Sequence, residues 1–343
     1  MFTHQRTRGG SAWAAFIAVA VIVGGGIITV PPQPAAATTG VIIPDGDYII
    51  ENVASHMVLD IPDASTTAST AIQLWTLNGT QAQQFHIARQ SDGSYEIKNL
   101  GSKMNLDVRK GSRDSGAVIQ QYTVNHTPAQ RWYIYHVGSS MATVIFINAG
   151  SGLALDVVKN RTVKGAAIQQ YTPNTTNAQS WLLAAVNPAR DLAPGPFMIG
   201  RDGFVLEAPS CPNQPCVVQP VRLATYPPGT LSASWLWMWY WDGQPWGASV
   251  LWNDLYRGVV PKGGGTTAGT PVVVDPDKAR SGGPDTMWKI VPGPKPPYYS
   301  IVNAYNLKAL DITKGSIVAG TPLQLWAPNS TPAQLFMFYV IPH

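Results

Sequence analysis

Four stretches of the chain repeat one set of polar and aromatic residues at constant spacing. Each set has an Asp between two apolar residues, a Gln 13 residues later, an aromatic residue two further on, and an Asn three beyond it. The sets are Asp60, Gln73, Trp75 and Asn78; Asp107, Gln120, Tyr122 and Asn125; Asp156, Gln169, Tyr171 and Asn174; and Asp311, Gln324, Trp326 and Asn329. A carboxylate accepts charge-assisted hydrogen bonds from adjacent hydroxyls, and an aromatic ring stacks on the apolar face of a pyranose. The spacing therefore predicts shallow, partly exposed pockets that suit a sugar.

A simpler interpretation of the Asp is that it ends a strand and bonds the turn that follows. That interpretation does not require an aromatic residue 15 positions later in every set. A second repeated pair, Gln-x-aromatic, is better explained as structure, because one buried aromatic residue per repeat would fill a small barrel. The Gln of the pair would satisfy backbone groups at a turn. These pairs are Gln83/Phe85, Gln130/Trp132, Gln179/Trp181 and Gln334/Phe336, and Trp237 and Trp288 stand at the equivalent aromatic position elsewhere.

The elements that carry these residues are predicted to be strands. Short runs such as 46–53, 93–100 and 142–149 alternate apolar and polar residues, and Asp-Gly pairs at 45–46, 92–93, 202–203 and 242–243 are tight-turn signals. No long segment after residue 40 has helical spacing. We therefore predict an all-β chain built from repeats of 47 to 49 residues, the distances from Asp60 to Asp107 and from Asp107 to Asp156.

Six repeats, numbered here as units 1 to 6, fit into the chain. Units 1, 2, 3 and 6 contain Asp60, Asp107, Asp156 and Asp311. Unit 4 is degenerate and aligns with Glu207 for the Asp, Gln219 for the Gln and Val221 for the aromatic residue; unit 5 has Val260, Val273 and Asp275 at these positions. A proline-rich stretch separates units 3 and 4. The predicted domains are thus 40–187 and 197–343, joined by a linker at 188–196.

The order apolar-Asp-apolar, Gln-x-aromatic and Gln-x-Trp, three times per domain, resembles the ricin B-chain type lectin family. The resemblance implies two tandem β-trefoils of three four-stranded repeats each, and carbohydrate binding by the Asp and the aromatic residue of each set above, with the first Gln either holding the Asp or reaching the ligand. A six-bladed propeller is the rival fold, but its blades would follow one another without the proline-rich break. The chain departs from the family at the residue before the second Gln. The family commonly has a sugar-binding Asn at this position, whereas this chain has Ala82, Ala129, Ala178 and Ala333. The Asn of each set is the candidate substitute.

The first 37 residues form a segment of a different kind. Arg6 and Arg8 precede an apolar run over 11–30 and a small-residue stretch at 35–37, the layout of a signal peptide cleaved after Ala37. We therefore expect a secreted, extracellular protein; membrane anchoring is expected only if the segment is not cleaved. In an exported chain, Cys211 and Cys216 are expected to form a local disulfide.

Charge and motifs narrow the function classes further. The formal charge of +4 includes the two arginines of the signal segment, so the mature surface has little excess positive charge and nucleic acid is not an expected partner. The sequence contains neither H-E-x-x-H nor G-x-S-x-G. We predict a secreted, non-catalytic carbohydrate-binding protein with up to four sites for glycans or polysaccharide, no metal and no cofactor. The alternative is a protein-binding β-trefoil, an inhibitor or targeting subunit, that uses loops of the second domain.

Overall fold

A computed structural model describes residues 40–342, apart from 139, 141, 175, 189–196, 210–217, 227–236, 241–248, 254–256 and 279–282. The predicted signal segment, the predicted disulfide Cys211–Cys216 and all of the predicted linker except Pro188 lie outside the described residues. Every element whose bounds lie within the described residues is a β-strand or a short 3-10 turn, so the predicted all-β class is confirmed.

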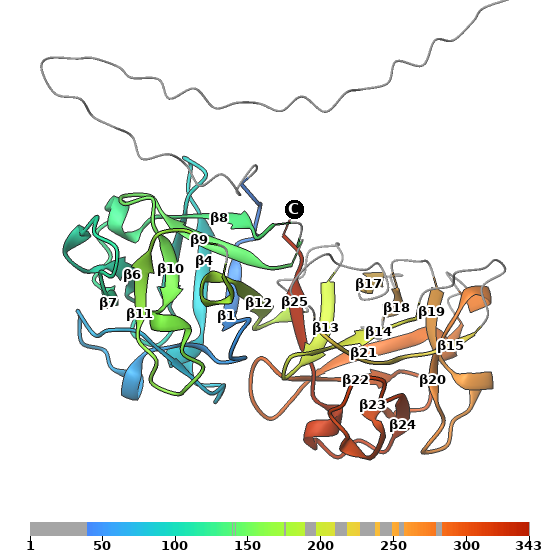
Figure 1. The fold of residues 1–343 in the computed structure, drawn as a ribbon. Helices are drawn as coiled ribbons and strands as arrows, with labels where there is room; N and C mark the ends of the chain where they lie inside the picture. Colours follow the sequence, from blue (N-terminus) through green and yellow to red (C-terminus); the bar gives the residue numbers. More distant parts are fainter. Residues whose placement is uncertain are drawn as a thin grey trace, which may run out of the picture. The chain divides into compact units, whose positions relative to one another are not determined.

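Six strands of the first half form a closed barrel in which each strand pairs antiparallel with two others (Figure 1). They are β1 (Gly46–Asn52), β4 (Phe85–Arg89), β5 (Tyr95–Asn99), β8 (Trp132–His136), β9 (Val144–Asn148) and β12 (Trp181–Ala185). Alternate residues of these strands point inward because side chains of a strand alternate between its two faces. Phe85 and Ile87 of β4 and Trp181 and Leu183 of β12 are buried in one apolar cluster for this reason.

Three hairpins, one per unit, accompany the barrel. They are β2 (Val58–Asp60) with β3 (Gln73–Trp75), β6 (Asn105–Val108) with β7 (Ile119–Tyr122), and β10 (Ala154–Val157) with β11 (Ile168–Tyr171). Single bridges connect them in a cycle: Ala71 to Gln120, Val118 to Gln169, and Ala167 to Gln73. A six-stranded barrel with a cyclic triplet of hairpins is a β-trefoil, and the propeller is excluded for this half.

The second half repeats the architecture. Its barrel contains β13 (Phe197–Arg201), β17 (Trp237–Tyr240), β18 (Ser249–Asn253), β21 (Met287–Pro292), β22 (Tyr299–Asn303) and β25 (Met337–Val340). The hairpins are β14 (Phe204–Glu207) with β16 (Arg222–Thr225), β19 (Arg257–Pro261) with β20 (Val272–Asp275), and β23 (Ala309–Ile312) with β24 (Leu323–Trp326). The short strand β15 (Gln219–Pro220) pairs with β20. The cycle closes through bridges from Pro271 to Gln324 and from Pro322 to Arg222.

The predicted core aromatic residues are buried. Trp132, Trp181, Trp237 and Trp288 are at most 1% exposed. The indole nitrogen of each donates to a hairpin carbonyl directly before the position of the repeated Asp, for example Trp181 Nε1 to Leu155 O at 3.2 Å. Since the same bond recurs in units 4 and 5, the degenerate units keep the structural half of the repeat.

Register confirms the alignment of unit 5 and corrects that of unit 4. Val260 lies opposite Val273 in unit 5, as Asp60 lies opposite Gln73 in unit 1. In unit 4, however, Arg222 lies opposite Glu207 and donates to its carboxylate at 2.8 Å. Alignment of Gln219 with the Gln of the repeat is therefore wrong. The separation of the opposed pair is 15 residues in unit 4 and 13 in the intact units, so sequence spacing alone misplaces it.

The same correction applies to the aromatic position of unit 4. Ala224 lies opposite Val205, as Trp75 lies opposite Val58, so Ala224 and not Val221 replaces the ring. Val221 is a buried core residue. The ring position is therefore Ala224 in unit 4 and Asp275 in unit 5, and neither residue is aromatic. Among the described residues, no helix has both the length and the apolar character needed to cross a membrane.

Candidate functional site

Each hairpin of an intact unit places three of the predicted site residues on one face. Asp107 at the end of β6 lies directly opposite Gln120 on β7. Directly opposed residues of an antiparallel pair share a face, and so do residues two apart along one strand. Tyr122, two residues after Gln120, is therefore on the same face as the carboxylate. The same register holds for Asp60 with Gln73, Asp156 with Gln169 and Asp311 with Gln324.

The first Gln of each set holds the Asp, as the resemblance implies. Its Nε2 donates to a carboxylate oxygen at 2.7 to 2.9 Å in all four units; in unit 2, Gln120 Nε2 lies 2.8 Å from Asp107 Oδ1.

The second Gln, predicted to be structural, also reaches the carboxylate. Gln130 Nε2 donates to Asp107 Oδ2 at 3.2 Å and to Thr123 O at 2.9 Å, while its Oε1 accepts from Asn125 N at 3.0 Å. Gln83, Gln179 and Gln334 make the same three bonds in units 1, 3 and 6. The prediction that this Gln satisfies turn backbone is confirmed, and the bond to the Asp was not foreseen. Each carboxylate oxygen thus accepts one amide proton and retains further lone pairs for a ligand.

Carboxylate and ring differ in exposure. The four Asp residues are only 4 to 5% exposed, whereas Trp75, Tyr122, Tyr171 and Trp326 are 36 to 43% exposed. The sequence predicts a partly exposed pocket; the structure exposes its ring and buries its carboxylate, to which two Gln side chains donate. The ring forms the open wall and the carboxylate lies at the base.

Burial has an electrostatic consequence at the base of the pocket. It raises the pKa of the Asp60, Asp107 and Asp156 carboxyls above the ordinary value, and the hydrogen bonds from the two glutamines oppose that rise.

The Asn of each set shapes the rim of the pocket. Asn125 Oδ1 accepts from Thr127 N at 3.1 Å and from Thr127 Oγ1 at 2.8 Å, and the same pair of bonds recurs in the other intact units. This arrangement is an Asx turn. Its sequence signal is a repeated Asn-x-Thr, and the predicted sets did not include the recurring rim residues Thr80, Thr127, Thr176 and Thr331. Since the Asn oxygen is engaged, the amide nitrogen is the atom that remains for a ligand.

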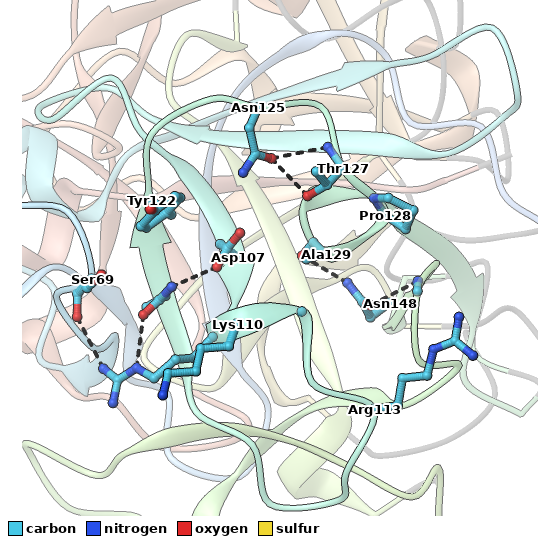
Figure 2. Close-up of a pocket in the computed structure, with 14 residues that line it drawn as sticks. Ser69, Asp107, Lys110, Arg113, Tyr122, Asn125, Thr127, Pro128, Ala129 and Asn148 are labelled. Carbon is cyan, nitrogen blue, oxygen red and sulfur yellow. Dashed lines mark hydrogen bonds between the residues drawn. The ribbon is translucent and has the colours of Figure 1, made fainter.

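Three of the intact units have a pocket over this constellation. The cavity volumes are about 710 Å³ in unit 2, about 720 Å³ in unit 6 and about 300 Å³ in unit 1. Each cavity is lined by the Asp, the first Gln, the ring and the Asn of its set, and by Ala129, Ala333 or Ala82. Figure 2 shows the unit 2 pocket, with Asp107 beside Tyr122 and the Asn125 turn above them.

Residues from neighbouring units also reach the pockets. Ser69 of unit 1 lines the unit 2 pocket, and its carbonyl accepts from Arg109 Nη2 at 3.1 Å. The ammonium of Lys164, from unit 3, lies 5.7 Å from the ring centroid of Trp75 in unit 1. The closed cycle of hairpins explains both contacts, because each hairpin borders the next.

The described residues contain no group of three or more His, Cys, Asp or Glu that could hold a metal ion. The prediction of no metal and no cofactor stays a prediction.

Comparison with known proteins gives one family and several similar folds. Residues 41–122, 128–192 and 239–326 match the family described as ricin-type beta-trefoil lectin domain-like. No curated protein matches the chain. A designed three-fold symmetric protein, ThreeFoil, is 29% identical, with 40% of this chain and 98% of that chain covered and a TM-score of 0.39.

Two natural proteins illustrate the range of similar structures. An exo-beta-1,3-galactanase from Clostridium thermocellum is 33% identical over 42% of this chain and 31% of its own length, with a TM-score of 0.40. The Macrolepiota procera ricin B-like lectin, solved in complex with lactose, is 15% identical over 41% of this chain and 96% of its own length, with a TM-score of 0.37. The sequence match extends over more than half of the residues, and its longest gap coincides with unit 4, whose repeat is degenerate. The chain belongs to the ricin-type beta-trefoil lectin domain-like family.

Proposed function

We propose that the protein is a non-catalytic, multivalent carbohydrate-binding protein that recognises glycans or polysaccharide through units 1, 2, 3 and 6. The observation that carries the proposal is the repeated pairing of a buried carboxylate, held by two glutamines, with an exposed ring on the same hairpin face. The carboxylate would accept bonds from two adjacent hydroxyls, and the ring would cover the apolar face of the sugar.

The chemistry of the unit 2 and unit 6 pockets supports binding rather than hydrolysis. Glycoside hydrolysis requires two carboxyl groups about 5–10 Å apart across the scissile bond. In the unit 2 and unit 6 pockets, Asp107 and Asp311 are the only carboxylates among the described lining residues. Each site is shallow and would be weak, so useful strength would come from several sites that engage one polymer together.

Replacement of the exposed rings tests the proposal without damage to the buried network. Trp75→Ala, Tyr122→Ala, Tyr171→Ala and Trp326→Ala, combined in one chain, should leave the fold intact and abolish retention on insoluble polysaccharide and signals on a glycan array. Tyr305→Ala is the matched control, because Tyr305 is 62% exposed and lies outside the four sets. A folded quadruple variant that binds glycans as the parent does would refute the assignment of the pockets.

Export is a separate proposal that rests on the N-terminal segment alone. Mass spectrometry of protein from the culture medium should give an N-terminus near Thr38. Recovery of the full-length chain from membranes would contradict cleavage and favour an anchored protein.

The protein-binding alternative stays a prediction, since the cysteine loop on which it rests lies outside the described residues. If no glycan surface retained the parent chain while a protein partner did, this alternative would replace the proposal.

A further inference from the structure

The pockets differ in charge, and the difference comes from the 3-10 turn after the Asp. The turns are Pro62–Ala64 in unit 1, Arg109–Gly111 in unit 2, Val158–Asn160 in unit 3 and Thr313–Gly315 in unit 6. The central residue of each turn has a positive φ of 53 to 59 degrees, so it stands at the same place in every unit: Asp63, Lys110, Lys159 and Lys314. The backbone is thus constant, and the side chains of this turn set the charge of each rim.

The unit 2 pocket has the strongest positive charge of the three. Arg109, Lys110 and Arg113 line it, against the single carboxylate of Asp107. In the view of Figure 2, Lys110 and Arg113 lie on the side of the pocket opposite the Asn125 turn.

The other two pockets have no such excess of positive charge. The unit 1 pocket is lined by the carboxylates of Asp60 and Asp63, and the ammonium of Lys164, 5.7 Å from the ring centroid of Trp75, does not outweigh their two negative charges. In the unit 6 pocket, the positive charge of Lys314 balances the negative charge of Asp311.

Arg109 is held in a fixed orientation within this group. Its Nε donates to Gln120 Oε1 at 2.9 Å and its Nη2 to Ser69 O at 3.1 Å. Gln120 in turn donates to Asp107, so the guanidinium is tied to the base of the site. An arginine has five N–H donors, and these two bonds leave three for a ligand. The corresponding residues Pro62, Val158 and Thr313 cannot supply such a group.

Lys110 and Arg113 add exposed positive charge at the rim. Both are exposed, and neither forms an ion pair with any residue that the structure describes. A fixed guanidinium presents paired donors that match a carboxylate or sulfate, and the side chains of Lys110 and Arg113 add positive charge to the same pocket. The carboxylate of Asp107 requires that the ligand direct hydroxyls to it and direct its own negative group toward Arg109.

We propose that the unit 2 site takes an acidic saccharide, a pyranose that carries a carboxylate or a sulfate. Tyr122 would stack on the ring, Asp107 would accept from its hydroxyls, and Arg109 would bind the anionic group with Lys110 and Arg113 at the rim. This inference rests on the proposed glycan-binding function and adds a ligand class to one of its four sites.

The test uses the full chain with only the unit 2 site intact, made by Trp75→Ala, Tyr171→Ala and Trp326→Ala. Calorimetry would compare oligogalacturonate, its carboxyl-reduced neutral counterpart and a sulfated galacto-oligosaccharide. We expect about tenfold tighter binding of at least one acidic probe than of the neutral one. The preference should shrink at high salt, because exposed charges are screened. The acidic probe that binds more tightly shows whether the site prefers a carboxylate or a sulfate.

Variants then locate the preference. Arg109→Gln, and separately Lys110→Gln with Arg113→Gln, should lower affinity for the acidic probe severalfold more than for the neutral one. Lys159→Gln, at the position of Lys110 in the unit 3 turn, is the matched control and should change neither the affinity for the acidic probe nor that for the neutral one. Thermal unfolding of each variant would show that the fold is kept.

The outcomes separate the two proposals. Equal affinity for acidic and neutral probes, or a preference that survives loss of all three cationic side chains, would overturn the acidic-saccharide inference and leave glycan binding in place. Absence of binding to any saccharide by the parent chain would instead overturn the proposed function itself.

Discussion

The two glutamines that hold each Asp are predicted to differ greatly in their contribution to stability, although both donate to the same carboxylate. In unit 3, Gln169 makes one such bond, to Asp156 Oδ1 at 2.7 Å, and its side chain is half-buried. Gln179 is fully buried and makes three bonds: to Asp156 Oδ2 at 3.1 Å, to Thr172 O at 3.0 Å, and from Asn174 N at 2.8 Å. Leu at either position approximates the volume of the Gln but cannot form hydrogen bonds.

The expected magnitudes follow from these bonds. A neutral hydrogen bond contributes about 0.5–1.5 kcal/mol net, and a bond to a charged group about 1.5–3 kcal/mol. Gln179→Leu should therefore lower the free energy of unfolding by about 3–5 kcal/mol, since it also leaves Asn174 N and Thr172 O without their partner. Gln169→Leu should lower it by about 1–2 kcal/mol, because one bond is lost at a partly hydrated position.

The assay combines urea unfolding with hydrogen exchange. Urea midpoints of the two variants and the parent give the loss of stability when the slopes agree. The exchange rate of the Asn174 amide should rise in Gln179→Leu and stay near the parent value in Gln169→Leu. If the two variants lost equal stability, or if the Asn174 amide remained protected in Gln179→Leu, the second Gln would not close the loop, and the structural role assigned to it would be wrong.

Three further predictions concern acid, a neighbouring lysine and the cysteine loop. Burial raises the pKa of Asp60, Asp107 and Asp156, so these carboxyls are protonated more easily in the folded state than in the unfolded state, and acidification through the folded pKa stabilises the fold through these groups. Protonation also removes the charged acceptor, so glycan affinity should fall at a higher pH than it would for an exposed Asp. Affinity titrations that stay flat until the ordinary Asp range would contradict this. In a chain where the other three rings are Ala, so that only the Trp75 site binds, Lys164→Met should change the glycan affinity. An unchanged affinity would show that the cation over Trp75 has no part in binding. Reduction of a Cys211–Cys216 disulfide should lower the free energy of unfolding by about 2 kcal/mol, the lower end of the usual range. Near- and far-ultraviolet circular dichroism would monitor the reduction, and a collapse of both trefoils would show that the pair has another role.

The amino-acid sequence determined the parts of this protein that depend on period and residue type. Alternating strands, Asp-Gly turns and a repeat of 47 to 49 residues give the all-β class. The aromatic residue of Gln-x-aromatic identifies the core in the four intact units, and Trp237 and Trp288 stand at the same aromatic position in the degenerate units, without the Gln. The Asp, the first Gln and the ring could be grouped for the same reason: the opposed strands of one hairpin bring together residues 13 apart, and a short hairpin is a local structure.

Only the tertiary structure decided what lies around that group. The second Gln bonds the Asp across 23 residues, and the Asp side chain is only 4 to 5% exposed, a burial that the spacing alone does not predict. The register of unit 4 placed Arg222 rather than Gln219 opposite Glu207, because pairing follows the closure of the hairpin cycle and not a constant count of residues. Arg109 is fixed by the carbonyl of Ser69, 40 residues earlier, and Lys164 reaches Trp75 from another unit. Closure of the threefold cycle creates these contacts between hairpins that are distant in the chain, and therefore the charge of each pocket depends on the folded molecule.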